Sequence, residues 1–236
     1  LEEMAGLAAP RGARVVMGRC YEMEQNMAYG PFVDALRSLL TVSRTAPRPC
    51  SPAQLAVVAE LLPELRQRWP DLPSYQPLPP DVEHTRLLTS LAQLIRLCAQ
   101  GEPLVLLLDD LHWADPSSLQ LVHYLARQTG TEPLLLVAAY RPTDLTSGHP
   151  LAVLRQRLIR QDDMSELELA ALHEDDVVLL LRILGRRDNG DKLARRLYRE
   201  TEGHPFFLAE VLRTLASEGL ALVAIASRPE VGGSNG

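Results

Sequence analysis

The chain has 236 residues, of which 46% are hydrophobic and 23% charged, and its 24 basic and 30 acidic side chains give a formal net charge of −6. This composition is typical of a folded globular protein and excludes disordered, collagen-like and disulfide-scaffold classes, while the acidic balance argues against broad binding of nucleic acid. The three cysteines form no C-x-x-C pair and no apolar run reaches the roughly 18 residues needed to cross a bilayer, so we expect a cytoplasmic protein without a membrane segment.

The first third of the chain is predicted to hold one short strand among helices. A β-branched run at residues 14–18 follows the breaker Pro10-Arg11-Gly12 and is typical of a strand. Ser51 is placed to cap a helix that Pro63 kinks or splits. In chain order we predict a helix over 1–9, a strand over 14–18, a helix over 31–40, a loop over 43–52, a helix over about 52–69 and an irregular connection over 70–80.

The middle of the chain alternates helices with strongly apolar strands. Leu104–Leu108 is an uninterrupted apolar run, typical of a central strand of a parallel sheet that is buried on both faces, and residues 134–139 repeat this pattern. Asp115 and Pro116 suit the N-cap and the first position of a helix. The predicted order is a helix over 81–100, a strand over 104–108, a helix over 115–128, a strand over 134–139 and a helix over 151–160. This alternation predicts an α/β fold with a parallel sheet.

The last third of the chain changes character. Met164–Leu169 is a candidate for one more strand. Beyond it, helical patterns over 173–184, 191–201 and 206–218 are separated by Gly or Pro, which predicts a helical subdomain. We therefore divide the chain into a core at 1–170, a helical subdomain at 171–222 and a linker-like tail at 223–236.

Charged side chains follow two of the predicted strands. In doubly wound sheets, ligands bind at the carboxyl ends of the parallel strands. Asp109 and Asp110 follow the first apolar strand, where one or two carboxylates and nucleotide phosphates could hold a divalent cation, as in a Walker B element. The alternative is that the acids only cap a buried strand where it reaches solvent. Arg141 follows the next strand and could reach a terminal phosphate, although an ordinary surface arginine fits the same pattern.

Several motifs occur together in one order. They are the segments 14–20, 29–32, 109–115, 117–119, 138–141 and 202–208. With these motifs the chain resembles, over about residues 1–220, the AAA-type signal-transduction (STAND) ATPase domain of large LuxR-type transcriptional regulators and related bacterial signalling ATPases. The combination in this order is far more specific than any one of its elements.

The resemblance implies a P-loop NTPase core of AAA type with a C-terminal helical lid, and ATP or ADP with Mg²⁺ as its ligands. Asp109 would match the acid that coordinates Mg²⁺, Asp110 the acid that positions or activates water, and Arg141 the sensor that faces the γ-phosphate. Gly203 and Pro205 would match the turn of the lid that packs near adenine.

Three further residues of the motifs have structural interpretations. We expect Trp113 to pack under the end of the strand and His112 to be structural. Asp115 is assigned mainly to helix capping, with a direct role in the site as the alternative.

The sequence lacks the phosphate-binding run expected beside these residues. Such sites use G-x-x-x-x-G-K-[ST], whose backbone N–H groups and helix N-terminus bind phosphate oxygens. The nearest run, at 185–193, has an aspartate directly before Lys192, a leucine after it and a helix in front of it, so we reject it. Lys192 is the single lysine, which leaves no other residue for this role. The resemblance implies that the sequence begins after the first strand and its loop; a degenerate ATPase that lost the loop is the alternative.

We expect an ATP-dependent regulatory switch in a bacterial signalling or transcription-regulator protein. The parent would be a slow Mg²⁺-dependent ATPase, and the present residues would be inactive alone. Its partners would be nucleotide, other domains of the parent chain and, as a possibility, a second copy, with DNA bound through a separate downstream domain. The alternative is a pseudo-ATPase, a non-enzymatic interaction module that binds protein partners through the helices at 81–100 and 205–218.

Overall fold

The computed structural model describes residues 1–41, 50–128, 132–184 and 190–217. Most of the predicted loop at 43–52, most of the rejected run at 185–193 and the whole predicted tail at 223–236 lie outside these residues. The chain divides into two compact units, Leu1–Ser165 and Glu166–Gly236, and each is described by itself.

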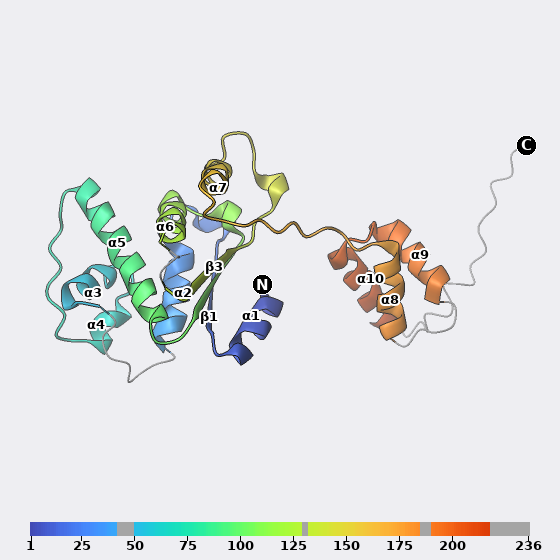
Figure 1. The fold of residues 1–236 in the computed structure, drawn as a ribbon, viewed down its shortest axis with the longest axis horizontal. Coiled ribbons are helices and arrows are strands. Elements are labelled where there is room, and N and C mark those ends of the chain that lie inside the picture. The colour runs from blue at the N-terminus through green and yellow to red at the C-terminus, as the bar shows by residue number, and fades with distance from the viewer. Residues whose placement is uncertain (42–49, 129–131, 185–189, 218–236) are drawn as a thin grey trace, which may run out of the picture. The chain divides into compact units, whose positions relative to one another are not determined.

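Three parallel strands form the sheet of the first unit. They are β1 (Arg14–Arg19), β2 (Leu104–Asp109) and β3 (Leu134–Ala138), in the spatial order β1-β2-β3 (Figure 1). Arg14 lies opposite Leu104, and Leu104 lies opposite Leu134, so the strands begin together and their carboxyl ends reach one edge. β2 is the central strand, and residues 104–108 are all buried. The prediction of a parallel α/β sheet with this strand at its centre is confirmed.

β3 differs from its prediction as a strand buried on both faces. Leu134 is buried, but Leu135 is 48% exposed. Within the described residues β3 has β2 as its one neighbouring strand. An apolar run does not by itself reveal whether both faces are covered, because the covering elements come from elsewhere in the chain. The prediction of full burial is therefore wrong for β3.

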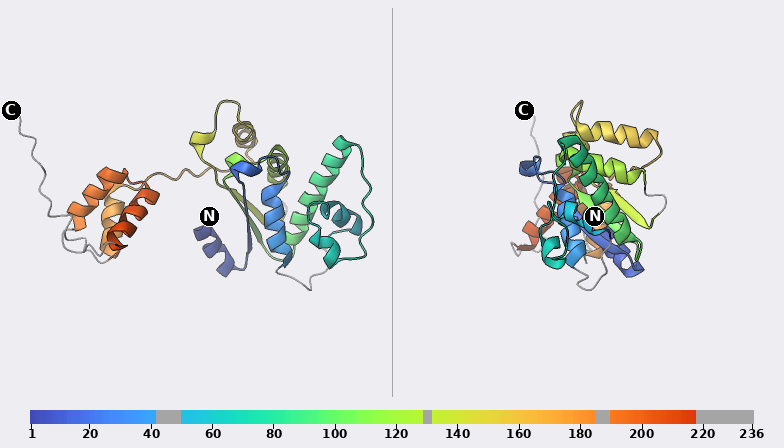
Figure 2. Two further views of the ribbon diagram at one scale, coloured as in Figure 1. Left: turned by 180° about the vertical axis from the view of Figure 1, so that it is seen from behind. Right: turned by 90° about the vertical axis from the view of Figure 1, so that its left-hand side faces the viewer.

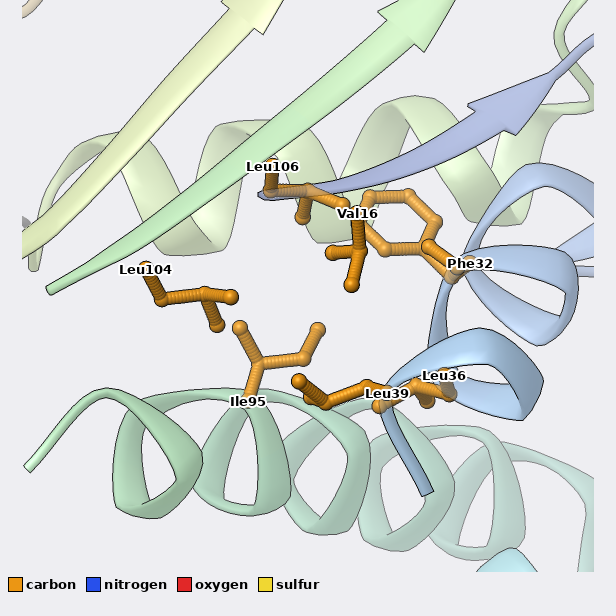
Figure 3. A pocket seen from close by; sticks show the side chains of 8 residues that line it. Val16, Phe32, Leu36, Leu39, Ile95, Leu104 and Leu106 are labelled. Atoms are coloured by element: carbon orange, nitrogen blue, oxygen red, sulfur yellow. The ribbon is translucent and has the colours of Figure 1, made fainter. Parts of the chain in front are cut away.

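Three helices cover one face of the sheet: α2 (Gly30–Thr41), α5 (Pro80–Ala99) and α6 (Pro116–Ala126) (Figures 1 and 2). Their apolar side chains and those of the strands form one core. Figure 3 shows part of this interior, where the apolar side chains of Val16, Phe32, Leu36, Leu39, Ile95, Leu104 and Leu106 meet. The gap between them has no polar side chain in its lining, so it is a packing feature rather than a candidate site. Each fully buried leucine or phenylalanine contributes about 1.5–3 kcal/mol relative to an exposed one.

Gly18 allows β1 and α2 to approach closely. A Cβ atom at this position would lie 1.9 Å from the carbonyl oxygen of Pro31, which is backbone and cannot swing aside. Any larger residue would therefore push the first turn of α2 away from the sheet. This contact fixes the path of the chain just after the carboxyl end of β1.

The remaining elements of the first unit are short, and the four 3₁₀ turns among them were not predicted. Ser51 caps α3 (Pro52–Val58) with a capping box, since its hydroxyl accepts from the N–H of Gln54 and the Gln54 side chain accepts from the N–H of Ser51. Pro63 separates α3 from α4 (Glu64–Arg68), as predicted. The others are α1 (Glu2–Ala8), α7 (Pro150–Arg160) and the 3₁₀ turns η1 (Ala9–Arg11), η2 (Glu22–Glu24), η3 (Leu111–Trp113) and η4 (Pro142–Asp144).

The second unit is helical in its described part. It contains α8 (Glu174–Ile183), α9 (Gly190–Thr201) and α10 (Pro205–Ser217), close to the three predicted helices. They enclose a separate small core of Val177, Leu181, Leu193, Ala194, Leu197, Leu208 and Leu215. None of the helices in the described part of either unit has the length and apolar content that crossing a bilayer requires.

The candidate strand at Met164–Leu169 is not formed. The segment has no helix or strand assignment, and Leu167 and Leu169 are 84% and 87% exposed. A strand needs a neighbour to pair with, and no described strand pairs with this segment. Alternating leucines were therefore an insufficient signal for a strand here.

Candidate functional site

The carboxyl ends of the three strands bring the predicted acids and the predicted arginine to one edge of the sheet. Asp109 ends β2, and Arg141 follows β3 by three residues. The loops after these strands are joined, because the N–H of Leu111 donates to the carbonyl oxygen of Ala139 at 2.8 Å. Asp109, Asp110 and Arg141 therefore belong to one region of the first unit.

Asp109 is held by hydrogen bonds to both of its carboxylate oxygens. Oδ1 accepts from the backbone N–H of Asp110 at 3.0 Å. Oδ2 accepts from the guanidinium of Arg19, with Nη2 at 2.6 Å and Nε at 3.2 Å. The hydrogen bond and charge of Asp109 raise the pKa of Arg19 above its ordinary value. A cation of the chain itself therefore sits on the carboxylate that was expected to hold Mg²⁺.

Arg19 was not among the predicted site residues. It is the last residue of β1, and it lies directly opposite Asp109 in the sheet register. The sequence carried one signal for it, since a charged residue at the end of a predicted parallel strand belongs at the same edge as the acids. The predicted first strand ends at residue 18, one residue short of Arg19.

Asp110 lies at a sharp turn of the backbone. Its φ of 53° and ψ of 40° place it in the left-handed region, which aspartate tolerates better than most residues. Its Oδ2 is 3.9 Å from Nε of Arg19, so the same guanidinium faces both acids. The turn starts η3, the 3₁₀ turn that carries the rest of the motif.

Two contacts connect the loop after β2 with the loop after β3. The His112 ring is buried, and its Nε2 lies 3.2 Å from Oδ2 of Asp144 without the alignment of a hydrogen bond. The guanidinium carbon of Arg141 lies 5.8 Å from the centre of the Trp113 ring, in cation–π range. The centres of the Trp113 and His112 rings lie 4.4 Å apart. The expected structural interpretations of His112 and Trp113 agree with this packing.

Asp115 caps helix α6, as predicted. It is 4% exposed, and its Oδ1 accepts from the backbone N–H groups of Ser117 at 2.9 Å and Ser118 at 3.0 Å. Its Oδ2 also accepts from the Ser118 hydroxyl. Three donors at the start of α6 thus satisfy this buried carboxylate, which accounts for its burial by helix capping.

A shallow pocket lies beside these residues. Its lining includes Arg19 at the end of β1, Tyr21 two residues later, and Trp113 and Asp115 from the segment after β2. Cys20 also lines it, and burial raises the pKa of its thiol to about 12, which makes this cysteine a poor nucleophile. The pocket therefore offers a guanidinium and an aromatic ring beside the acids.

The donor set at this edge fits a divalent cation that arrives with additional ligands. Asp109 and Asp110 supply carboxylate oxygens, which Mg²⁺ prefers, and Mg²⁺ commonly takes one or two of them together with phosphate oxygens and water. In the described part of the chain, no group of three or more His, Cys, Asp and Glu residues could hold a metal ion by itself. The two acids thus suit a metal ion bound with a phosphorylated ligand.

Gly203 and Pro205 belong to the second unit. Gly203 has a φ of 71°, and a Cβ atom there would lie 2.0 Å from the carbonyl oxygen of Leu172, so the turn needs glycine. The N–H of Leu172 donates to the carbonyl oxygen of Gly203 at 3.0 Å. Pro205 is the first residue of α10. The predicted tight break between two helices is confirmed, and the predicted contact of these residues with adenine stays a prediction.

Comparison with known families identifies a match over the first part of the chain. Residues 1–137, more than half of the chain, match the model of the AAA ATPase domain. Comparisons with curated proteins and with solved structures give no match. The matched range includes Arg19, Asp109 and Asp110 but stops before Arg141 and Gly203.

Proposed function

We propose that this chain, which belongs to the AAA ATPase domain family, is an ATP-binding and ATP-hydrolysing regulatory switch of a bacterial signalling or transcription-regulator protein. Family membership indicates binding of nucleotide. The observation that carries the proposal further is the pair of carboxylates at the carboxyl edge of the parallel sheet, with Arg141 at the end of the next strand. The motif order that resembles STAND ATPases of LuxR-type regulators supports the regulatory context and a cytoplasmic location.

In this proposal each predicted residue has one task. Asp109 would hold Mg²⁺, which when bound would neutralise phosphate charge. Asp110 orients a water molecule and accepts its proton. Arg141 reports whether a terminal phosphate is present, held until then against the ring of Trp113. Gly203 and Pro205 supply the lid turn near adenine.

The 236 residues contain no run that matches the phosphate-binding loop of the proposed site. A loop of the form G-x-x-x-x-G-K-[ST] would supply backbone N–H groups and a lysine to the phosphates. We propose that a segment other than these 236 residues supplies it, so that the 236 residues alone do not hydrolyse ATP. The function must therefore be tested on the full-length product of the gene.

The test compares three variants of the full-length protein. Asp110→Asn should retain Mg²⁺–ATP affinity within about threefold and lose hydrolysis by about a hundredfold or more, since it removes a proton acceptor. Asp109→Asn should weaken the Mg²⁺-dependent part of ATP binding. Asp34→Asn, a half-exposed acid of α2 that pairs with Arg37, is the control and should change neither quantity. Calorimetric titration and phosphate release are the measurements; absent Mg²⁺–ATP affinity, or undiminished hydrolysis in Asp110→Asn, would overturn the catalytic assignment.

A second candidate is a pseudo-ATPase that acts as an interaction module. The contact of Arg19 with Asp109 favours it, because the guanidinium occupies the expected metal ligand. Phe206 and Phe207 at the start of α10 are 63% and 55% exposed, which suits a protein partner. A full-length protein that binds no Mg²⁺–ATP but loses its regulatory output in a double alanine variant of these phenylalanines would favour this candidate.

A further inference from the structure

The contact between Arg19 and Asp109 is built into the sheet. The two residues end neighbouring parallel strands and are opposite one another in the register. Both the Nη2 and Nε groups of Arg19 donate to the same carboxylate oxygen, Oδ2. The backbone N–H of Asp110 fixes the other oxygen of Asp109 at 3.0 Å. Sheet pairing therefore delivers the guanidinium to this acid without any help from a flexible loop.

A nearby positive charge stabilises the two carboxylates of Asp109 and Asp110 at this edge of the sheet. Asp109 and Asp110 are neighbours in sequence, and their side chains are only 22% and 21% exposed. Water therefore screens the repulsion between the two carboxylates only in part. Arg19 lies within 4 Å of both carboxylates. A divalent cation at Oδ2 of Asp109 would meet the guanidinium at close range, because Arg19 already donates to that atom.

We propose that Arg19 is an internal counter-ion of the acid pair, which keeps Asp109 from binding a divalent cation until a phosphate takes over the guanidinium. The positive charge repels a bare metal ion, and it must leave Oδ2 before the metal can bind there. A phosphate group is a suitable new partner, since arginine binds phosphate through two parallel N–H donors as it binds carboxylate. Arg19 is thus a positioning residue that makes binding of metal and of nucleotide depend on one another.

The release of Arg19 to a phosphate rests on the proposed function. The exclusion of a divalent cation by Arg19 concerns the nucleotide-free protein alone. The test uses Mn²⁺ as the probe, with free Mn²⁺ measured by electron paramagnetic resonance in the absence of nucleotide. The unmodified protein should bind Mn²⁺ weakly. Arg19→Gln should bind it at least about tenfold more tightly, because a positive charge next to the site has been removed. Arg19→Lys, which keeps the charge, should bind as weakly as the unmodified protein.

Two controls locate the effect. Arg37→Gln removes an arginine of similar exposure, 48% against 51%, that pairs with Glu64 away from the site, and it should leave Mn²⁺ affinity unchanged. Adding Asp109→Asn to Arg19→Gln should abolish the gain. Circular dichroism and the unfolding midpoint of each variant show that it is folded.

The outcomes separate the counter-ion role from the proposed function. Unchanged Mn²⁺ affinity in a folded Arg19→Gln protein would overturn the inference and leave Arg19 as an ordinary ion pair. Tight Mn²⁺ binding by the unmodified protein would overturn it as well. If Arg19→Gln gains Mn²⁺ affinity but the full-length protein binds no Mg²⁺–ATP, the counter-ion role stands and the proposed function fails.

Discussion

Tyr29 illustrates how strongly single residues near the strand ends are constrained. It is 1% exposed and has a φ of 61°, a left-handed conformation that costs a bulky residue free energy. Its hydroxyl lies 3.4 Å from Nδ1 of His84, whose Nε2 lies 2.5 Å from Oε1 of Gln120. Burial, with the negative charge of Asp115 as the second cause, raises the pKa of Tyr29 to about 12. The folded protein therefore keeps this phenol protonated where an unfolded chain would ionise it.

Tyr29 should make the protein sensitive to alkaline pH. The phenol ionises near pH 10 in the unfolded chain and near 12 in the folded one, so its contribution is fully present below pH 10 and is lost as pH rises toward 12. Over that interval the unmodified protein should lose about 3 kcal/mol of unfolding free energy relative to Tyr29→Phe. The thiols of Cys20 and Cys50 also have pKa values raised to about 12. Their contributions cancel in the comparison, because the unmodified protein and Tyr29→Phe both contain these cysteines. Urea unfolding at several pH values measures the difference in unfolding free energy between the two proteins. If this difference were the same at pH 10 and at pH 12, the raised pKa of Tyr29 would be contradicted.

At the scale of the elements, two helices begin with the same capping chemistry in different surroundings. Asp115 at α6 is buried and accepts two backbone N–H groups, whereas Ser51 at α3 is exposed and accepts from the N–H of Gln54 at 3.3 Å. Water can replace the lost acceptor at α3 but not at α6. Asp115→Ala should therefore cost about 2–3 kcal/mol and Ser51→Ala about 1 kcal/mol.

Urea unfolding followed by tryptophan fluorescence can compare the two caps, because both tryptophans, Trp69 and Trp113, belong to the first unit. Asp115→Asn serves as the matched variant, since it keeps an acceptor oxygen and removes the charge, and it should fall between the unmodified protein and Asp115→Ala. Equal losses for Asp115→Ala and Ser51→Ala would show that burial of the cap is unimportant.

Some helices and strands could be predicted from local sequence patterns, and others could not. The strand Leu104–Leu108 and the helix starts at Ser51 and Asp115 follow from local signals, namely an apolar run and capping side chains. The exposure of Leu135 and the missing strand at Met164–Leu169 depend on what lies beside each segment, which no local pattern contains. The ion pair of Arg19 with Asp109 depends on strand register, which is likewise set by the packing of distant segments.

For the whole molecule, the two units have separate cores. The larger one combines the three strands with helices α2 to α7, and all of its buried residues lie before residue 166. The smaller one lies within the three described helices of the second unit. Of the predicted site residues, Asp109, Asp110 and Arg141 lie in the first unit, and Gly203 and Pro205 in the second. The proposal that all five act at one nucleotide rests on the resemblance, because no pattern within one unit contains all of them.

Because the first unit has a hydrophobic core of its own, a chain that ends at Ser165 should fold by itself and unfold cooperatively in urea, as reported by Trp69 and Trp113. Within that shortened chain, Leu106→Ala should lower the unfolding free energy by about 2–5 kcal/mol, since Leu106 is 2% exposed and its removal leaves a cavity beneath the sheet. Leu135→Ala makes the same chemical change on β3, where the side chain is 48% exposed, and should cost less than about 1 kcal/mol. A broad, non-cooperative transition would show that the first unit needs residues beyond Ser165. Equal losses for the two leucines would instead show that the far face of β3 is covered in solution.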